Sequence, residues 1–152
     1  MRPGDLALPF SLPDEQGITR TLGEFLARGP VVLFFYPAAM SPGCTAESCH
    51  FRDLRAEFAA LGATRLGISR DDPTAQRRFS DRHGFDFPLL SDAQDEVAEN
   101  YGVRRHLRVL PTKRRTFVIG TDGRVAAVIK SETRMAAHAD RALAILREMA
   151  AT

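Results

Sequence analysis

A run of six apolar residues, Val31 to Tyr36, constrains the fold of this chain more than any other feature. The residues do not alternate with polar ones, as they would in a strand with one face in water. Gly29-Pro30 precedes the run and Pro37 follows it, so both of its ends are marked. We therefore expect a strand that is covered on both faces, which is typical of a central strand in an α/β sheet.

The segments around this strand alternate between helical and extended patterns. Thr21 and Glu24 have the spacing of a capping box, and Gly120 to Gly123 is a favourable hairpin turn. The expected elements are a hairpin over 10–19, a helix over 21–27, the strand over 31–36, a helix over 42–61, a strand over 64–69, a helix over 72–84, an extended segment over 87–90, a helix from Ser91 or Asp92 to 101, a loop over 104–115, a hairpin over 116–129 and a helix over 136–149. This order predicts an α/β fold.

Two of the expected helices carry an apolar face. In the first, apolar residues recur at helical spacing at Phe51, Leu54, Phe58 and Leu61. In the last, the face that we expect to pack consists of Ala139, Leu143, Leu146 and Ala150.

Length and composition restrict the class of protein. A chain of 152 residues with 44% hydrophobic and 26% charged residues fits one compact globular domain over 1–152. No apolar stretch is long enough for a bilayer or a secretory signal, so we expect no membrane association and a cytoplasmic location. The net charge of +2 is too small to indicate nucleic-acid binding by itself.

The only two cysteines, Cys44 and Cys49, lie near the expected start of a helix after Ser41-Pro42-Gly43. Free backbone N–H groups and the positive end of the helix dipole favour a thiolate over a thiol at such a place. Cys44 is therefore a candidate reactive thiolate. A structural disulfide is not expected in the cytoplasm.

The spacing of the two cysteines limits what they can do together. In a helix, residues five apart have Cα atoms about 8 to 9 Å apart, whereas a disulfide tolerates about 7 Å. A bond between Cys44 and Cys49 therefore requires the first turns of the helix to unwind. Cys49 can equally be a structural thiol, and no metal or cofactor is expected because His50, His83, His106 and His138 form no ligand pattern with the cysteines.

The segment from Phe35 to Cys49 closely resembles the active-site stretch of peroxiredoxins, whose pattern of Pro, Thr or Ser, and Cys falls here on Pro37, Ser41 and Cys44. A second cysteine five residues later is similar to the bacterioferritin comigratory protein, or peroxiredoxin Q, subfamily. Further landmarks follow in the same order over nearly the whole chain, at Phe51-Arg52-Asp53, Phe87 to Asp92, Tyr101-Gly102-Val103 and Arg114 to Ile119. The resemblance implies a thioredoxin-like fold with an N-terminal hairpin and a central mixed sheet flanked by helices.

The resemblance also implies a role for each site residue. Cys44 would be the peroxidatic cysteine, which attacks a hydroperoxide and becomes a sulfenic acid. Ser41 and Arg114 would stabilise the peroxide oxygens, and Pro37 would shield the sulfur. Ser41 can also be only a helix cap. The motif assigns the arginine to Arg114, with Arg115 as the alternative.

A reductant and a substrate follow from the same resemblance. Cys49 would be the resolving cysteine of an atypical two-cysteine peroxiredoxin, forming an intramolecular disulfide that thioredoxin or a similar dithiol protein reduces. Such a pair needs no dimer, so we expect a monomer. Ala38 and Ala39 replace the polar pair common after this proline. This difference leads to the hypothesis that alkyl hydroperoxides are favoured over hydrogen peroxide.

Two other functions are alternatives to a peroxidase. A general dithiol-disulfide oxidoreductase is the nearest, and Val109-Leu110-Pro111-Thr112 faintly resembles the proline loop of thioredoxins, but such enzymes place only two residues between their cysteines. A nucleic-acid or acidic-partner binding module would use the basic residues between Arg104 and Arg115. That segment has no aromatic residues for base stacking, so a solvated loop is the simpler interpretation.

Overall fold

The computed structural model describes residues 1–105 and 112–152. Its main sheet has five strands in the order β5-β4-β3-β6-β7. β3 pairs in parallel with β4 and antiparallel with β6, so the sheet is mixed. The strands of this sheet are β3 (Val31–Phe35), β4 (Thr64–Ser69), β5 (Leu89–Ser91), β6 (Arg115–Ile119) and β7 (Val125–Lys130). The expected central strand is therefore confirmed.

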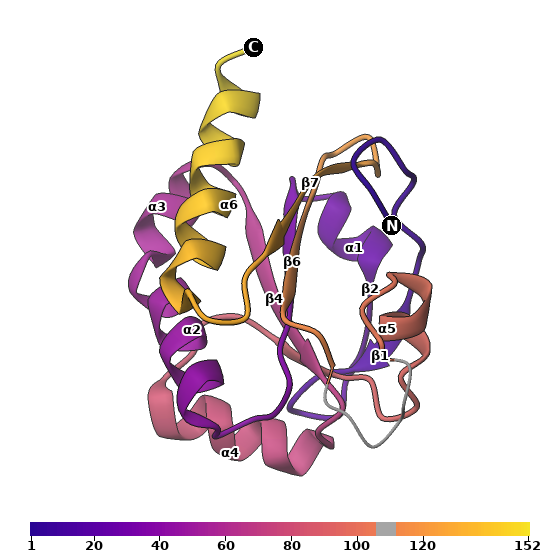
Figure 1. Cartoon of the computed structure of the whole chain (residues 1–152), viewed down its shortest axis with the longest axis vertical. Coiled ribbons are helices and arrows are strands. Elements are labelled where there is room, and N and C mark those ends of the chain that lie inside the picture. Colours follow the sequence, from indigo (N-terminus) through magenta and orange to yellow (C-terminus); the bar gives the residue numbers. More distant parts are fainter. Residues whose placement is uncertain (106–111) are drawn as a thin grey trace.

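A small hairpin and six helices complete the described fold. The hairpin pairs β1 (Ser11–Pro13) with β2 (Thr19–Thr21). The helices are α1 (Leu22–Leu26), α2 (Pro42–Asp53), α3 (Arg55–Ala60), α4 (Pro73–His83), α5 (Glu96–Asn100) and α6 (Met135–Ala150). Figure 1 shows α2, α3, α4 and α6 on one face of the sheet, and α1, α5 and the hairpin on the other.

The burial of β3 explains its unbroken apolar sequence. Every residue of β3 is fully buried. Leu33 and Phe35 pack with α1 and α5, whereas Phe34 and the following Tyr36 pack with α2, α3, α4 and α6. Because successive side chains of a strand point to opposite faces, a strand between two helical layers needs apolar residues at every position.

Some boundaries differ from those expected. The helix expected over 42–61 is interrupted at Leu54, whose ψ of 18° leaves the helical region, so α2 and α3 are separate helices. α5 begins only at Glu96, yet Asp92 still caps it, because its carboxylate accepts hydrogen bonds from the N–H groups of Val97 and Ala98 at 3.2 and 2.8 Å.

Two further expectations are wrong in detail. Arg115 belongs to β6 rather than to a loop, and it pairs with Phe35 across the sheet. Ala150 is exposed at the end of α6, while His138 and Ala142 join the buried face instead.

The middle of the loop expected over 104–115, and most of the faint proline loop over 109–112, fall on residues 106–111, which lie outside the described part of the chain. Of the basic residues in that segment that are described, Arg104 pairs with Glu99, and Arg105 and Arg115 pair with Glu132.

The loop between β3 and α2 is anchored from β4. The Ala39 N–H donates to Asp71 Oδ2 at 2.7 Å, and the hydroxyl of Ser69, the last residue of β4, donates to the same carboxylate. Met40 adopts a positive φ of 68° at the turn into α2. The start of α2 is thus fixed at the carboxyl end of the central strand.

None of the described helices is long and apolar enough to cross a membrane.

Candidate active site

Cys44 lies in the first turn of α2, as the sequence predicts. Its side chain is fully buried, and it is a free thiol. Ser41 occupies the N-cap position, but its hydroxyl makes no hydrogen bond to the helix. The hydroxyl donates instead to the Ala38 carbonyl at 2.9 Å. The cap residue therefore stabilises the preceding loop rather than the free N–H groups of the first turn.

Arg114 is the arginine that the fold brings to Cys44. Its Nη2 lies 3.3 Å from Sγ, and only 7% of its side chain is exposed. The neighbouring Arg115 is directed elsewhere, with Nη1 3.1 Å from Glu132. Gly43 leaves room for the guanidinium, because a Cβ there would lie 3.2 Å from Arg114 Nη2. This placement agrees with the motif assignment of Arg114 over Arg115.

Glu47, which the sequence motifs do not single out, holds the other edge of the same guanidinium. Arg114 Nη1 donates to Glu47 Oε1 at 2.8 Å, and the Glu47 side chain is wholly buried. Burial raises the pKa of Glu47 to about 8, and the nearby Arg114 opposes this rise. A signal was present in the sequence: Cys44, Glu47 and Phe51 have helical spacing, so a carboxylate stands within an apolar stripe.

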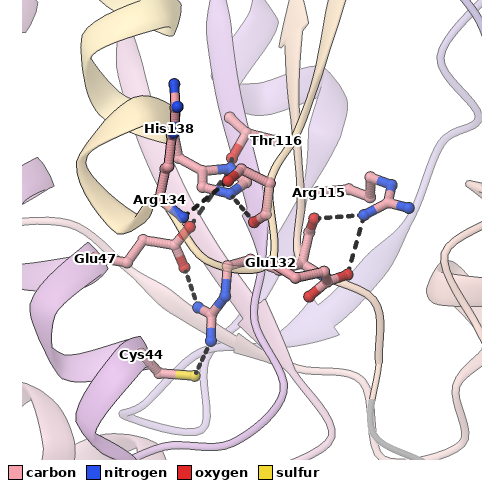
Figure 2. Close-up of polar contacts among 9 residues, drawn as sticks. Cys44, Glu47, Arg115, Thr116, Glu132, Arg134 and His138 are labelled. Carbon is pink, nitrogen blue, oxygen red and sulfur yellow. Dashed lines mark hydrogen bonds and ion pairs between the residues drawn. The ribbon is translucent and has the colours of Figure 1, made fainter.

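A second residue missed from the sequence, His138, faces Glu47 from α6. Its Nδ1 lies 3.5 Å from Glu47 Oε2 and 2.7 Å from Thr116 Oγ1, and its Nε2 lies 2.7 Å from the Ser131 carbonyl oxygen. Burial is the main cause that lowers the pKa of His138. The chain of contacts from Cys44 to His138 can be followed in Figure 2. One signal for His138 is present in the sequence, which is its position beside Ala139 on the apolar face of the last helix.

Glu132 fixes the backbone that presents Arg114. Its Oε1 accepts a hydrogen bond from the Arg114 N–H at 3.2 Å and lies 3.1 and 3.6 Å from the guanidinium groups of Arg115 and Arg105. Arg114 lies immediately before β6, and Glu132 lies in the segment after β7. Figure 2 shows Arg115 and Glu132 in contact at the edge of the cluster.

Cys49 and Pro37 make no contact with Cys44 comparable to that of Arg114. Cys49 lies further along α2, is a half-buried free thiol, and has its pKa raised by burial. Pro37 is half-buried in the loop between β3 and α2. The roles predicted for these two residues stay predictions.

No metal centre is found within the part of the chain that the structure describes. No three His, Cys, Asp or Glu side chains among the described residues are grouped closely enough to hold an ion. His50, the histidine nearest to Cys49 in sequence, pairs with Asp140 of α6 at 2.7 Å.

The arrangement of Cys44 and Arg114 offers a buried sulfur with a fixed cation beside it. Such a pair suits the attack of a thiolate on an electrophile that develops negative charge.

Comparison with known proteins shows which family this chain is similar to. Residues 3–128 match the AhpC/TSA family. A protein of Mycobacterium tuberculosis named as a peroxiredoxin is 56% identical over 149 residues, which are 97% of this chain and 97% of that protein. The crystal structure of peroxidoxin BcpB from the same organism has a TM-score of 0.95 at 56% identity and covers 98% of each chain.

A third comparison reaches the subfamily expected from the cysteine spacing. The bacterioferritin comigratory protein of Xanthomonas campestris superimposes with a TM-score of 0.85 at 33% identity, covering 99% of this chain and 97% of the other. These likenesses confirm the thioredoxin-like fold and the resemblance drawn from Pro37, Ser41 and Cys44. The chain belongs to the AhpC/TSA family, as a peroxiredoxin of the bacterioferritin comigratory protein type, and is a thiol-dependent peroxidase.

Proposed function

We propose that Cys44 is the residue that reduces hydroperoxides. Its thiolate attacks one peroxide oxygen and the O–O bond breaks, so that the sulfur becomes a sulfenic acid. The released hydroxide or alkoxide takes up a proton and leaves as water or an alcohol. The contact of 3.3 Å between Arg114 Nη2 and Cys44 Sγ carries this proposal. A guanidinium remains charged at any working pH, so it can stabilise both the thiolate and the charge that moves onto the leaving oxygen.

Ser41 and Pro37 have supporting roles in this proposal. The Ser41 hydroxyl and the free N–H groups at the start of α2 would contact the peroxide oxygens. The hydroxyl now donates to the Ala38 carbonyl, so it would have to turn toward a bound peroxide. Pro37 would limit access to the sulfur from the loop side and so restrict further oxidation.

Cys49 would resolve the sulfenic acid. Its thiolate would attack the Cys44 sulfur, form the intramolecular disulfide and release water, as in an atypical two-cysteine peroxiredoxin. Both cysteines lie on α2, which runs from Pro42 to Asp53. Because a helix holds residues five apart beyond disulfide reach, this step requires the first turns of α2 to unwind. A cycle between a folded and an unwound α2 follows.

A thiol reductant completes the cycle, and thioredoxin or a similar dithiol protein is the one we propose. We also propose a cytoplasmic location, where dithiol proteins keep thiols reduced. We further propose one domain over 1–152 and a monomer, because an intramolecular pair of cysteines needs no second subunit. A general dithiol oxidoreductase is not favoured, since its cysteines would be able to bond without unwinding a helix.

The loop beside Cys44 supports a preference for alkyl hydroperoxides. Ala38, Ala39 and Met40 carry no polar side-chain atoms other than a thioether, and Met40 is 45% exposed. The related bacterioferritin comigratory protein of Xanthomonas campestris has alkyl peroxide reduction activity. Comparing turnover of an alkyl hydroperoxide with that of hydrogen peroxide tests the preference, and equal or faster turnover of hydrogen peroxide would refute it.

The proposed cycle is tested by NADPH consumption coupled through thioredoxin and its reductase. We expect Cys44→Ser to abolish peroxide-dependent consumption. We expect Cys49→Ser to reduce a single equivalent of peroxide but not to turn over with thioredoxin. Full thioredoxin-dependent turnover in the Cys49→Ser variant would remove the resolving role, and peroxide reduction by Cys44→Ser would remove the peroxidatic one.

A further inference from the structure

Two buried titratable side chains lie on the side of Arg114 away from Cys44: Glu47, which contacts the guanidinium, and His138, which faces Glu47. Neither side chain has any exposed surface, and Oε2 faces Nδ1 at 3.5 Å between α2 and α6. Glu47 Oε2 has no hydrogen-bond partner. The charged groups that surround the pair are Cys44 on α2, Arg114 and Arg115 at the start of β6, and Glu132 after β7.

The hydrogen bonds of His138 show where a proton can be placed. A carbonyl oxygen only accepts, so the contact of 2.7 Å with the Ser131 carbonyl requires a proton on Nε2. Nδ1 then either accepts from Thr116 Oγ1, in a neutral imidazole, or carries a second proton, in an imidazolium. Only Nδ1 and the Glu47 carboxyl can therefore gain or lose a proton here.

The charge balance of the buried cluster decides how many protons the pair holds. A Cys44 thiolate and the Arg114 guanidinium cancel each other. With one proton on either Oε2 or Nδ1, the pair adds no net charge. With none, the cluster holds a net negative charge, and with two a net positive one. An uncompensated charge in a buried site is costly, so one proton is the favoured state.

We propose that Glu47 and His138 are positioning residues that hold one proton between them, and that this proton leaves the positive charge of Arg114 to the Cys44 sulfur. The proposal rests on the proposed role of Cys44. When the pair keeps its proton, Glu47 Oε1 orients the guanidinium without competing for its charge. When the proton is lost, Glu47 becomes an unbalanced carboxylate only 2.8 Å from Arg114 Nη1.

The directions of the two pKa shifts agree with this geometry. Burial raises the pKa of Glu47 to about 8 and lowers that of His138, so near neutral pH the proton belongs to Glu47 and the imidazole is neutral. Glu132, the other nearby carboxylate, forms ion pairs with Arg115 and Arg105 at 3.1 and 3.6 Å, so its charge is already balanced. The pair should therefore lose its proton above about pH 8.

The rate of peroxide reduction by Cys44 tests the proposal. The Cys49→Ser variant serves as the parent, because it isolates the first chemical step from resolution and from thioredoxin. We expect its single-turnover rate constant with hydrogen peroxide to fall by about tenfold well above pH 8, the size of one charge-assisted hydrogen bond. Adding Glu47→Gln should abolish this decline, because the amide cannot ionise. A decline that persists in the Glu47→Gln variant would overturn the proposal.

The chain offers a matched control on the same two helices. His50 of α2 and Asp140 of α6 form a second histidine–carboxylate pair at 2.7 Å, but their side chains are 32% and 60% exposed. We expect Asp140→Asn to keep the parent's rate and its alkaline decline. Loss of the decline in Asp140→Asn would show that it does not arise at Glu47, and would contradict the proposal.

A spectroscopic measurement tests the pair without relying on activity. The ¹⁵N signals of the His138 ring should report a proton on Nε2 near neutral pH and should shift above about pH 8 in the parent, but not in the Glu47→Gln variant. Signals of His138 that do not change over that range in the parent would overturn the shared proton. If Cys44 reduces no peroxide at any pH, the proposed function fails, while these signals still decide the state of the pair.

Discussion

At the scale of single residues, the site depends on one guanidinium that serves two partners. Arg114 contacts the Cys44 sulfur through Nη2 and the Glu47 carboxyl through Nη1. The planar fork of an arginine presents two nitrogens in fixed positions, one for each partner, whereas a lysine would have to serve both partners from a single nitrogen. The identity of this residue, and not only its charge, is therefore expected to matter.

The first prediction separates Arg114 from its neighbour. Arg114→Lys should lower the rate constant for peroxide reduction by about 10²-fold, as expected for loss of one preorganised donor to the transition state. Arg115→Lys keeps a charge near the exposed Glu132 and should change the rate by no more than about twofold. Single-turnover kinetics of the two variants provide the comparison, and equal losses would contradict the assignment of Arg114.

Sequence motifs named two of the residues that the structure brings together at the candidate site, but not the residues that support them. Cys44 and Arg114 belong to local motifs, so they could be named before the fold was known. Glu47 and His138 lie 91 positions apart and meet only because α2 packs beside α6. A buried glutamate or histidine has no local signal of its partner, so only the packed structure reveals the pair.

At the scale of elements, helix and strand patterns predicted most of the order from β1 to α6. Buried strands and capped helices were found because burial on two faces and capping boxes leave local signals, as at β3 and at Thr21 with Glu24. The interruption at Leu54 was missed because Phe51 and Phe58 still face the sheet on either side of it. Helical spacing alone cannot show where a chain turns between two helices that share a core.

The second prediction concerns the unwinding of α2. Forming the Cys44–Cys49 disulfide should break the backbone hydrogen bonds of the first turns of α2 and leave the five-stranded sheet intact. Hydrogen exchange followed by mass spectrometry should therefore show faster exchange in the peptide over 42–53 after oxidation, and unchanged exchange in β3 and β4. Equal protection of α2 before and after oxidation would contradict resolution by Cys49.

At the scale of the whole molecule, the active-site helix is part of the main core. Phe34 of β3 is fully buried and stacks on Phe51 of α2, with ring centroids 4.2 Å apart. Packing of α2 against the sheet therefore couples the site to global stability. The unwinding that we propose for resolution would have to release the first turns of α2 without losing the contact of Phe51 with Phe34.

The third prediction measures this core. Phe34→Ala should lower the free energy of unfolding by about 3 to 5 kcal/mol, the usual cost of truncating a buried phenylalanine. Ile18 is an apolar residue that is 55% exposed in the turn of the N-terminal hairpin, and Ile18→Ala should cost no more than about 0.5 kcal/mol. Urea denaturation of both variants checks the difference, and a small loss in Phe34→Ala would contradict the central place of β3.

The fourth prediction concerns stability against pH. The pKa of Glu47 is raised from 4.5 to about 8 in the folded protein, so the folded state binds more protons than the unfolded state between these values. The contribution of Glu47 to stability is therefore complete below about pH 4.5 and is lost as the pH rises toward about 8. Wild type should lose stability relative to Glu47→Gln over this range, by a few kcal/mol at most.

Denaturation of the two proteins at several pH values checks this prediction. Burial lowers the pKa of His138, so His138 favours folding more as the pH rises through its unfolded value of 6.5. Because His138 Nδ1 faces Glu47 Oε2 at 3.5 Å, the two groups titrate together, and the difference between the two proteins reports the pair rather than Glu47 alone. His138 changes charge around its unfolded value of 6.5, so the growth of the difference between about pH 7 and about pH 8 is the part that reports Glu47. A difference in unfolding free energy that does not grow with pH would show that Glu47 is already ionised in the folded protein.

The central claim is that Cys44 carries out the peroxidase reaction of this chain. The most direct test treats the reduced Cys49→Ser variant with one equivalent of hydroperoxide and determines by mass spectrometry which residue has gained an oxygen atom, with a sulfenic-acid-specific reagent as the trap. We predict one trapped sulfenic acid, on Cys44, formed as the peroxide disappears. Peroxide consumption without a trapped sulfenic acid on Cys44 would contradict the account.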